Sequence, residues 1–144
     1  MQSLENTMLI TDLDGTLLPA SKEISVADAA AISQFRAKGG KFAIATGRTL
    51  QAAQRYLKKL QPNIPVILFN GAAIYDPVAE KWLYTEELPS EAAAITRQVL
   101  EAFPDVSAEI LRTDGTYVSR MTPYEKEHLE NPFWQCRRKF RMVG

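Results

Sequence analysis

The sequence predicts an α/β fold in which a parallel sheet is followed by a smaller α+β part. Between residues 8 and 69, three short apolar segments alternate with two amphipathic segments of helical period. This pattern is typical of parallel strands joined by crossover helices. After residue 71 the pattern changes to a hairpin, a helix and a second hairpin. We therefore expect two domains, at residues 1–87 and 88–144.

The first strand is expected at residues 8–11, an apolar run that ends at Asp12. A helix follows, with Ser25 as its N-cap and Asp28 three residues later, as in a capping box. The helix ends before the glycine pair at residues 39–40. Its apolar face consists of Val26, Ala29, Ala30, Ile32 and Phe35.

The second strand is expected at residues 42–45 and the third at residues 65–69. Thr49 can cap a helix that runs between them from residue 50 to about residue 60. The apolar stripe of this helix consists of Leu50, Ala53, Tyr56, Leu57 and Leu60.

The rest of the chain predicts an α+β module rather than further parallel strands. Asp114-Gly115 is a favourable hairpin turn, and Pro123 fits the first position of a helix. The expected elements are a hairpin of residues 73–75 and 82–84, a helix at 90–103, strands at 106–111 and 116–118, and a helix from Thr122.

Polar side chains stand where each expected strand of the parallel sheet ends. Asp12 and Asp14 follow the first strand, Thr46 follows the second, and Asn70 follows the third. Right-handed crossovers bring the carboxyl ends of such strands to one edge of the sheet. Because ligands of open α/β sheets bind beyond that edge, we expect one crevice to collect these residues.

The segment from Asp12 to Thr16 places two carboxylates on a short loop in which Gly15 allows a tight turn. Paired carboxylates suit Mg²⁺, and they can divide nucleophilic and proton-transfer roles between them. A Ca²⁺ loop of the EF-hand type is excluded because Leu17 occupies the position that requires glycine. An ordinary acidic turn is the alternative, and the position directly after a buried strand favours a functional site.

Thr46-Gly47-Arg48 offers a hydroxyl, backbone N–H groups and the start of a helix, all of which favour an anion. By itself the segment equally fits a strand end followed by a surface charge. With Asp12 at the end of the neighbouring strand, phosphate binding is favoured. Asn70-Gly71 is a simple turn in isolation, and its place at the same crevice makes it a candidate substrate contact.

Four other features have simpler explanations than catalysis. A solvated side chain is favoured for His128, the only histidine, and a hairpin turn for Asp114. The basic segment at residues 137–141 is typical of a solvated tail. Cys136 is the only cysteine, so no intramolecular disulfide can form.

The composition excludes several classes of partner. Seventeen basic and 17 acidic residues give a formal net charge of zero, so no global field favours a nucleic acid or a membrane surface. No segment approaches the ~18 apolar residues of a membrane span, and the start of the chain does not resemble a signal peptide. We expect a cytoplasmic protein.

The segment I-T-D-L-D-G-T-L-L at residues 10–18 resembles the first signature of the haloacid dehalogenase superfamily. The segment A-T-G-R at residues 45–48, together with Asn70-Gly71, resembles its Cof-type, sugar-phosphatase-like branch. The resemblance covers residues 7–120. It implies a Rossmann-like core followed by part of a large α/β cap, and a phosphatase of small phosphorylated metabolites.

The resemblance also implies roles for the site residues. Asp12 would be the nucleophile that forms an aspartyl-phosphate, and Asp14 would protonate the leaving oxygen and later activate water. The Asp12 carboxylate and the Asp14 backbone carbonyl would hold Mg²⁺. The phosphoryl oxygens would be bound by Thr46, Gly47, Arg48, Gly15 and Thr16.

The sequence departs from the branch after the cap. Members continue with a lysine that steadies the phosphate and with a G-D-x-x-N-D-like loop that completes the metal site. No such string occurs here, and Lys126 and Lys139 lie in the wrong region to supply that lysine. We therefore expect a truncated chain with poor activity, and a frameshifted or truncated reading frame as the origin of the tail at residues 133–144.

Two further expectations follow from the truncation. The first strand would keep an uncovered apolar edge, which favours self-association. The alternatives to an impaired phosphatase are a non-catalytic remnant or phospho-ligand-binding module, and a phosphotransferase that shares the aspartyl-phosphate step.

Overall fold

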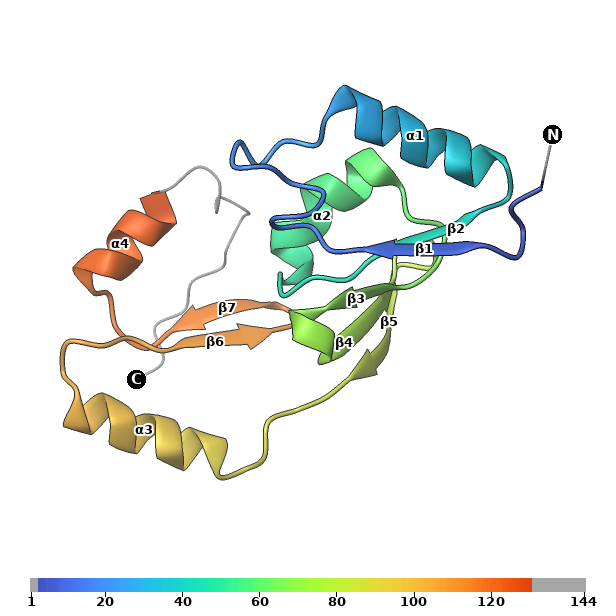
Figure 1. Cartoon of the computed structure of the whole chain (residues 1–144). Helices are drawn as coiled ribbons and strands as arrows, with labels where there is room; N and C mark the ends of the chain where they lie inside the picture. The colour runs from blue at the N-terminus through green and yellow to red at the C-terminus, as the bar shows by residue number, and fades with distance from the viewer. Residues whose placement is uncertain (1–2, 131–144) are drawn as a thin grey trace. The chain divides into compact units, whose positions relative to one another are not determined.

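The computed structural model describes residues 3–130. The chain divides into two compact units, Met1–Glu86 and Glu87–Gly144. The first unit contains strands β1 to β5 with helices α1 and α2, and the second contains α3, β6, β7 and α4 (Figure 1).

The parallel sheet of the first unit is built from the predicted strands. β1 (Met8–Thr11) pairs in parallel with β2 (Lys41–Ile44), and Figure 1 shows the two side by side. β3 (Val66–Leu68) joins β2 through one parallel bridge between Ala45 and Ile67. The predicted α/β fold with a parallel sheet is thus confirmed.

β3 also begins an antiparallel meander with β4 (Ala73–Asp76) and β5 (Lys81–Thr85). The predicted third strand, 65–69, is one residue too long at each end. At its carboxyl end the reason is local, because Phe69 has a left-handed backbone with φ 53° and starts the short 3-10 turn η1 (Phe69–Gly71).

The two helices begin at the predicted caps. In α1 (Val26–Ala37) the Ser25 hydroxyl accepts the Asp28 N–H, and in α2 (Leu50–Leu60) the Thr49 hydroxyl accepts the Ala52 N–H. α1 contacts both β2 and α2, which places the two helices on the same face of the sheet. Val26 is 86% exposed and Ala30 is also exposed, so the assignment of these two residues to the apolar face of α1 was wrong. Val26 is the first helical residue and precedes the turn that reaches the core.

The core of the first unit lies between α2 and the sheet. The predicted stripe of α2 is buried apart from the half-buried Leu50. β1 differs from the other two strands of the parallel sheet, because Met8, Leu9 and Ile10 are 57%, 41% and 47% exposed. Within residues 3–130, β1 pairs only with β2, so its other edge is open. The largest fully buried side chains of this unit are Phe42, Leu13, Leu18, Ile44, Leu60, Leu68 and Val66.

The second unit contains α3 (Ala92–Ala102), the hairpin β6 (Glu109–Arg112) and β7 (Gly115–Val118), and α4 (Pro123–Glu130). These are the predicted element types, and Pro123 is the first residue of α4. Gly115 pairs with Arg112, so the turn consists of Thr113 and Asp114 rather than the predicted Asp114-Gly115.

Several sequence predictions fall outside the described region. They concern Cys136, the basic segment 137–141 and the tail 133–144, and the side chain of His128 is likewise not described. Across residues 3–130, no helix is both long and apolar enough to span a lipid bilayer.

Leu13 anchors the acidic loop in the core, because its side chain is 0% exposed. We expect Leu13→Ala to lower the free energy of unfolding by about 2–5 kcal/mol, as other buried leucine truncations do. The matched variant Leu83→Ala removes a side chain that is 48% exposed, and it should cost less than about half of that. Urea unfolding of both variants measures the difference, and equal losses would contradict a core role for Leu13.

Candidate active site

The loop after β1 is a tight turn fixed by its own backbone. The Leu18 N–H donates to the Leu13 carbonyl at 2.7 Å, and the Gly15 N–H donates to the Leu18 carbonyl at 3.1 Å. Gly15 has φ +79°, a conformation that glycine adopts without strain. The buried Leu13 and Leu18 hold the loop, which leaves Asp12 exposed and Asp14 half-buried at its surface.

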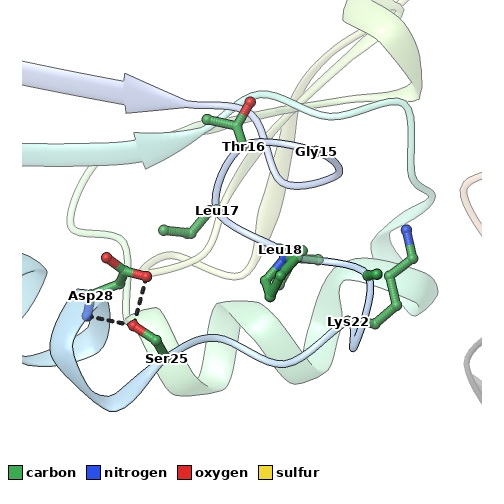
Figure 2. A pocket seen from close by; sticks show the side chains of 9 residues that line it. Gly15, Thr16, Leu17, Leu18, Lys22, Ser25 and Asp28 are labelled. Carbon is green, nitrogen blue, oxygen red and sulfur yellow. Dashed lines mark hydrogen bonds between the residues drawn. The ribbon is translucent and has the colours of Figure 1, made fainter.

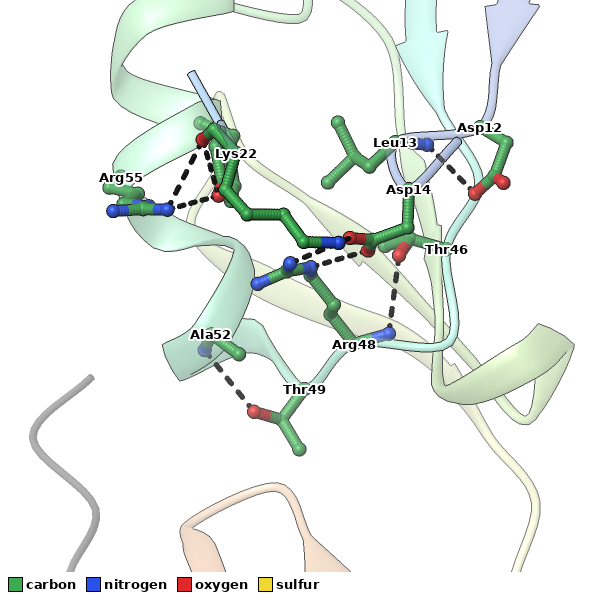
Figure 3. A network of polar contacts seen from close by, with 10 residues as sticks. Asp12, Leu13, Asp14, Lys22, Thr46, Arg48, Thr49, Ala52 and Arg55 are labelled. Carbon is green, nitrogen blue, oxygen red and sulfur yellow. Dashed lines mark hydrogen bonds and ion pairs between the residues drawn. The ribbon is translucent and has the colours of Figure 1, made fainter. Parts of the chain in front are cut away.

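The Asp14 carboxylate joins this loop to the loop after β2. The Arg48 guanidinium donates from Nε to Oδ2 at 2.7 Å and from Nη2 to Oδ1 at 2.9 Å. The Lys22 ammonium donates to Oδ1 at 2.7 Å. Figure 3 shows both cations converging on this one carboxylate. Two parallel bonds from a guanidinium to a carboxylate fix orientation as well as distance.

Arg48 is the more firmly held of the two cations. Its side chain is only 6% exposed, and its guanidinium also lies 5.1 Å from the ring centre of the buried Tyr56. A buried cation requires compensation by an anion, and Asp14 supplies it. The hydrogen bonds from Arg48, opposed by partial burial and reinforced by Lys22, hold the pKa of the Asp14 carboxyl well below its usual range. Asp14 is therefore ionised in this arrangement.

Thr46 lies in the same network. Its hydroxyl accepts the backbone N–H of Arg48 at 3.3 Å, which leaves the hydroxyl proton free to donate to another oxygen. Its backbone is fixed by the third strand of the sheet, since the Thr46 N–H donates to Ile67 and the Thr46 carbonyl accepts the Asn70 N–H. The loops after β2 and β3 are thus bonded to each other.

Gly47 and Asn70 are also brought together. A Cβ atom at Gly47 would lie 2.5 Å from the Asn70 side-chain oxygen, so a larger residue at position 47 would force the Asn70 side chain to shift. Asn70 has a left-handed backbone with φ 56°, which asparagine tolerates better than most residues. Asn70 therefore lies against the loop that carries Thr46, as the sequence predicted for this edge of the sheet.

The backbone N–H groups around the site differ in whether they are already hydrogen-bonded. The N–H groups of Gly15 and Thr16 are used inside the acidic loop, on Leu18 and Leu13 respectively. A phosphate role for these two residues stays a prediction, and it rests on the exposed Thr16 hydroxyl rather than on the backbone. Within residues 3–130, the N–H groups of Asp14 and Gly47 have no hydrogen-bond partner.

Asp12 has a different environment from Asp14. Its Oδ1 accepts the Leu13 N–H at 2.7 Å, and no cation of the described chain pairs with its exposed carboxylate. A carboxylate of this kind and the nearby Asp14 carbonyl fit Mg²⁺, which often binds one or two carboxylates and keeps several waters. The Asp14 carboxylate, paired with two cations, is not a free ligand. No group of three or more His, Cys, Asp or Glu side chains placed to hold a metal occurs in the described residues.

The sequence did not reveal Lys22 as a site residue. Lys22 also lines an open hollow of about 520 Å³ beside the acidic loop, whose far end carries the cap residues Ser25 and Asp28 (Figure 2). The position of the Lys22 side chain depends on the left-handed backbone of this residue, with φ 57°, and the local sequence does not predict that conformation.

Comparison with known proteins identifies the family. A family profile described as haloacid dehalogenase-like hydrolase matches residues 9–141, nearly the whole chain. The chain belongs to the haloacid dehalogenase-like hydrolases. The phosphatase YitU of Bacillus subtilis, named for 5-amino-6-(5-phospho-D-ribitylamino)uracil, is 30% identical over 129 residues, which are 88% of this chain and 46% of YitU.

Solved structures of haloacid dehalogenase-like hydrolases share the fold. One from Bacteroides thetaiotaomicron superposes with a TM-score of 0.77 at 20% identity, covering 96% of this chain and 52% of its own. A sugar phosphatase of subclass IIB gives a TM-score of 0.75 at 23% identity, covering 88% and 49%. The predicted membership of the haloacid dehalogenase superfamily is confirmed by the family profile, and the Cof-type branch stays a prediction. The chain spans about half the length of these relatives.

The ion pairs of Asp14 predict a pH dependence of stability. Asp14 has a folded-state pKa below its ordinary 3.8, so the pairs stabilise the fold above that pH, and this contribution is lost as the pH falls further. We expect wild type to be more stable than Asp14→Asn at neutral pH, with a difference that shrinks progressively below pH 3.8. Thermal unfolding of both proteins from pH 7 downward measures this, because the other carboxyls cancel in the comparison. A difference that stays constant to the lowest pH would contradict the ion pairs.

Proposed function

We propose that this chain carries the nucleophile and the phosphoryl-binding groups of a phosphatase of small phosphorylated metabolites. The observation that carries the proposal is the bonding of three strand-end loops into one group. Asp14 is bonded to Arg48, Arg48 to Thr46, and the Thr46 loop to Asn70. Family membership and the name of the relative YitU, which specifies a phosphorylated compound, support the substrate class.

Asp12 is proposed as the nucleophile because its carboxylate is exposed and pairs with no cation of the described residues. One of its oxygens forms a bond to phosphorus while the bond from phosphorus to the leaving oxygen breaks. Water then attacks the aspartyl-phosphate, which releases inorganic phosphate and regenerates the carboxylate. The bond from the Leu13 N–H orients the carboxylate for the first step.

The phosphoryl oxygens are proposed to bind donors that have no acceptor among residues 3–130. These donors are the Thr46 hydroxyl and the backbone N–H groups of Gly47 and Asp14. Fixed donors of this kind stabilise the charge that spreads over the equatorial oxygens in the transition state. Arg48 then acts on Asp14 rather than directly on phosphate, which changes its expected role to that of a positioning residue.

Asp14 is proposed to give a proton to the leaving oxygen in the first step and to take a proton from the attacking water in the second step. Its ionised state in the free protein suits the base that activates water. For Asp14 to act as an acid, one of the two cations that pair with its carboxylate must leave it. When bound, Mg²⁺ would be held by the Asp12 carboxylate and the Asp14 carbonyl, and it would supply positive charge that offsets the charge of the phosphoryl group.

We expect the chain by itself to be a weak phosphatase. The lysine and the second acidic loop implied by the family resemblance do not occur in its sequence. Loss of one preorganised charged or hydrogen-bonding group typically costs about 10²–10³ in rate. The alternative is a module that binds a phosphorylated ligand without turning it over.

Hydrolysis of p-nitrophenyl phosphate with Mg²⁺ distinguishes these two functions. We expect weak turnover that Asp12→Asn abolishes, because an amide cannot form the acyl phosphate. Asp105→Asn removes an exposed carboxylate of the second unit and should leave turnover unchanged. Equal turnover by wild type and Asp12→Asn would contradict catalysis by this chain. Addition of a recombinant carboxyl-terminal half of a related enzyme should raise the rate if the missing groups limit it.

Self-association through β1 is the second part of the proposal. The strand exposes three apolar side chains along an edge that, in the described residues, has no partner and no charged residue. Such edges pair with other strands. We expect sedimentation velocity to show concentration-dependent dimers that Met8→Lys abolishes and that Val78→Lys, at an exposed turn, does not. Monomers at all concentrations would contradict this.

A further inference from the structure

The backbone of Lys22 is fixed in an unfavourable conformation. Its φ of 57° is left-handed, a conformation that is unfavourable for a non-glycine residue. Its N–H donates to the Pro19 carbonyl at 2.9 Å, and its carbonyl accepts the Tyr56 hydroxyl at 3.1 Å and Arg55 Nη2 at 3.3 Å. Glycine would adopt this backbone conformation with less strain. The turn itself therefore does not require lysine, and the role of this residue lies in its side chain.

The side chain of Lys22 reaches back eight residues to the Asp14 carboxylate. There it meets the second cation, Arg48, on the same carboxylate. Asp12, Asp14, Lys22 and Arg48 together carry two negative and two positive charges. A bound phosphate would bring further negative charge beside Asp12, and a cation that moved onto a phosphoryl oxygen would stabilise that charge directly.

Lys22 is the cation that can change partners. Its side chain is 30% exposed, it lines the open hollow, and its ammonium ends a flexible stem. Arg48 is 6% exposed, bonds to Asp14 through two nitrogens and lies against Tyr56. Moving Arg48 would break several contacts, whereas moving Lys22 breaks one ion pair.

We infer that Lys22 is a ligand-binding cation that pairs with Asp14 in the free protein and with a phosphoryl oxygen of the bound ligand. This inference rests on the proposed function. It adds Lys22 as a ligand-binding residue and the exchange of its ion-pair partner as a step. Arg55 and Tyr56 act through Lys22 by holding its carbonyl, so they are positioning residues. The partner exchange removes a cation from Asp14 at the moment when a phosphoryl group arrives.

Titration calorimetry of the full chain with inorganic phosphate, in the presence of Mg²⁺, tests the inference. Lys22→Met and Lys22→Gly should each weaken phosphate binding by about tenfold or more, the size expected for a hydrogen bond to a charged group. Lys22→Arg should restore most of the affinity. Lys58→Met removes an exposed lysine of α2 and should change nothing.

Lys22→Gly separates binding from structure. Glycine relieves the left-handed strain, so its melting temperature without phosphate should equal or exceed that of Lys22→Met. A purely structural role for Lys22 would make Lys22→Gly bind phosphate better than Lys22→Met, and that result would overturn the inference.

A double-mutant cycle tests the exchange itself. Lys22→Met and Asp14→Asn should show a coupling in thermal stability without phosphate, and saturating phosphate should abolish it. A coupling that phosphate leaves unchanged would overturn the exchange.

Failure of this inference is distinguishable from failure of the proposed function. If Thr46→Val weakens phosphate binding but Lys22→Met and Lys22→Gly do not, Lys22 has no ligand role and the proposed site stands. If the wild-type chain binds no phosphate, or if Thr46→Val binds it equally well, both proposals fail.

Discussion

The bidentate ion pair between Asp14 and Arg48 is the constraint on which the site depends. It joins the loop after the first strand to the loop after the second, across 34 positions of sequence. Each side requires the other, because Arg48 is buried and needs an anion, and Asp14 is half-buried and needs a donor. The core beneath, built on Leu13 and α2, fixes both ends of the pair.

This constraint also divides the two aspartates into different chemical groups. Asp14 is paired with two cations and ionised, whereas Asp12 is exposed and, among residues 3–130, its carboxylate is bonded only to the backbone beside it. A difference in environment is what lets paired carboxylates take separate roles. Both aspartates belong to the same short loop. Their different environments therefore result from the cations that the fold brings to each carboxylate.

The sequence predicted those parts of the fold that depend on local pattern. The β1 strand, the Ser25 and Thr49 caps and the stripe of α2 appear where periodicity and capping residues placed them. Three features could not be predicted from the sequence because they depend on backbone turns or on contacts between distant loops. The third strand ends at Leu68 because Phe69 is left-handed, and Lys22 reaches Asp14 through another left-handed turn. The ion pair between Arg48 and Asp14 joins two loops that are distant in the sequence. The grouping of Thr46 with Asn70 followed from topology alone.

We propose that Asp12 and the Thr46 loop form one phosphoryl site. Fluorine NMR with trifluoroberyllate, which attaches to a nucleophilic carboxylate as a phosphoryl analogue, tests this site without requiring turnover. We expect protein-bound fluorine resonances in the presence of Mg²⁺, their loss in Asp12→Asn, and a shift of at least one of them in Thr46→Val. Bound resonances that persist in Asp12→Asn, or that are identical in wild type and Thr46→Val, would contradict it.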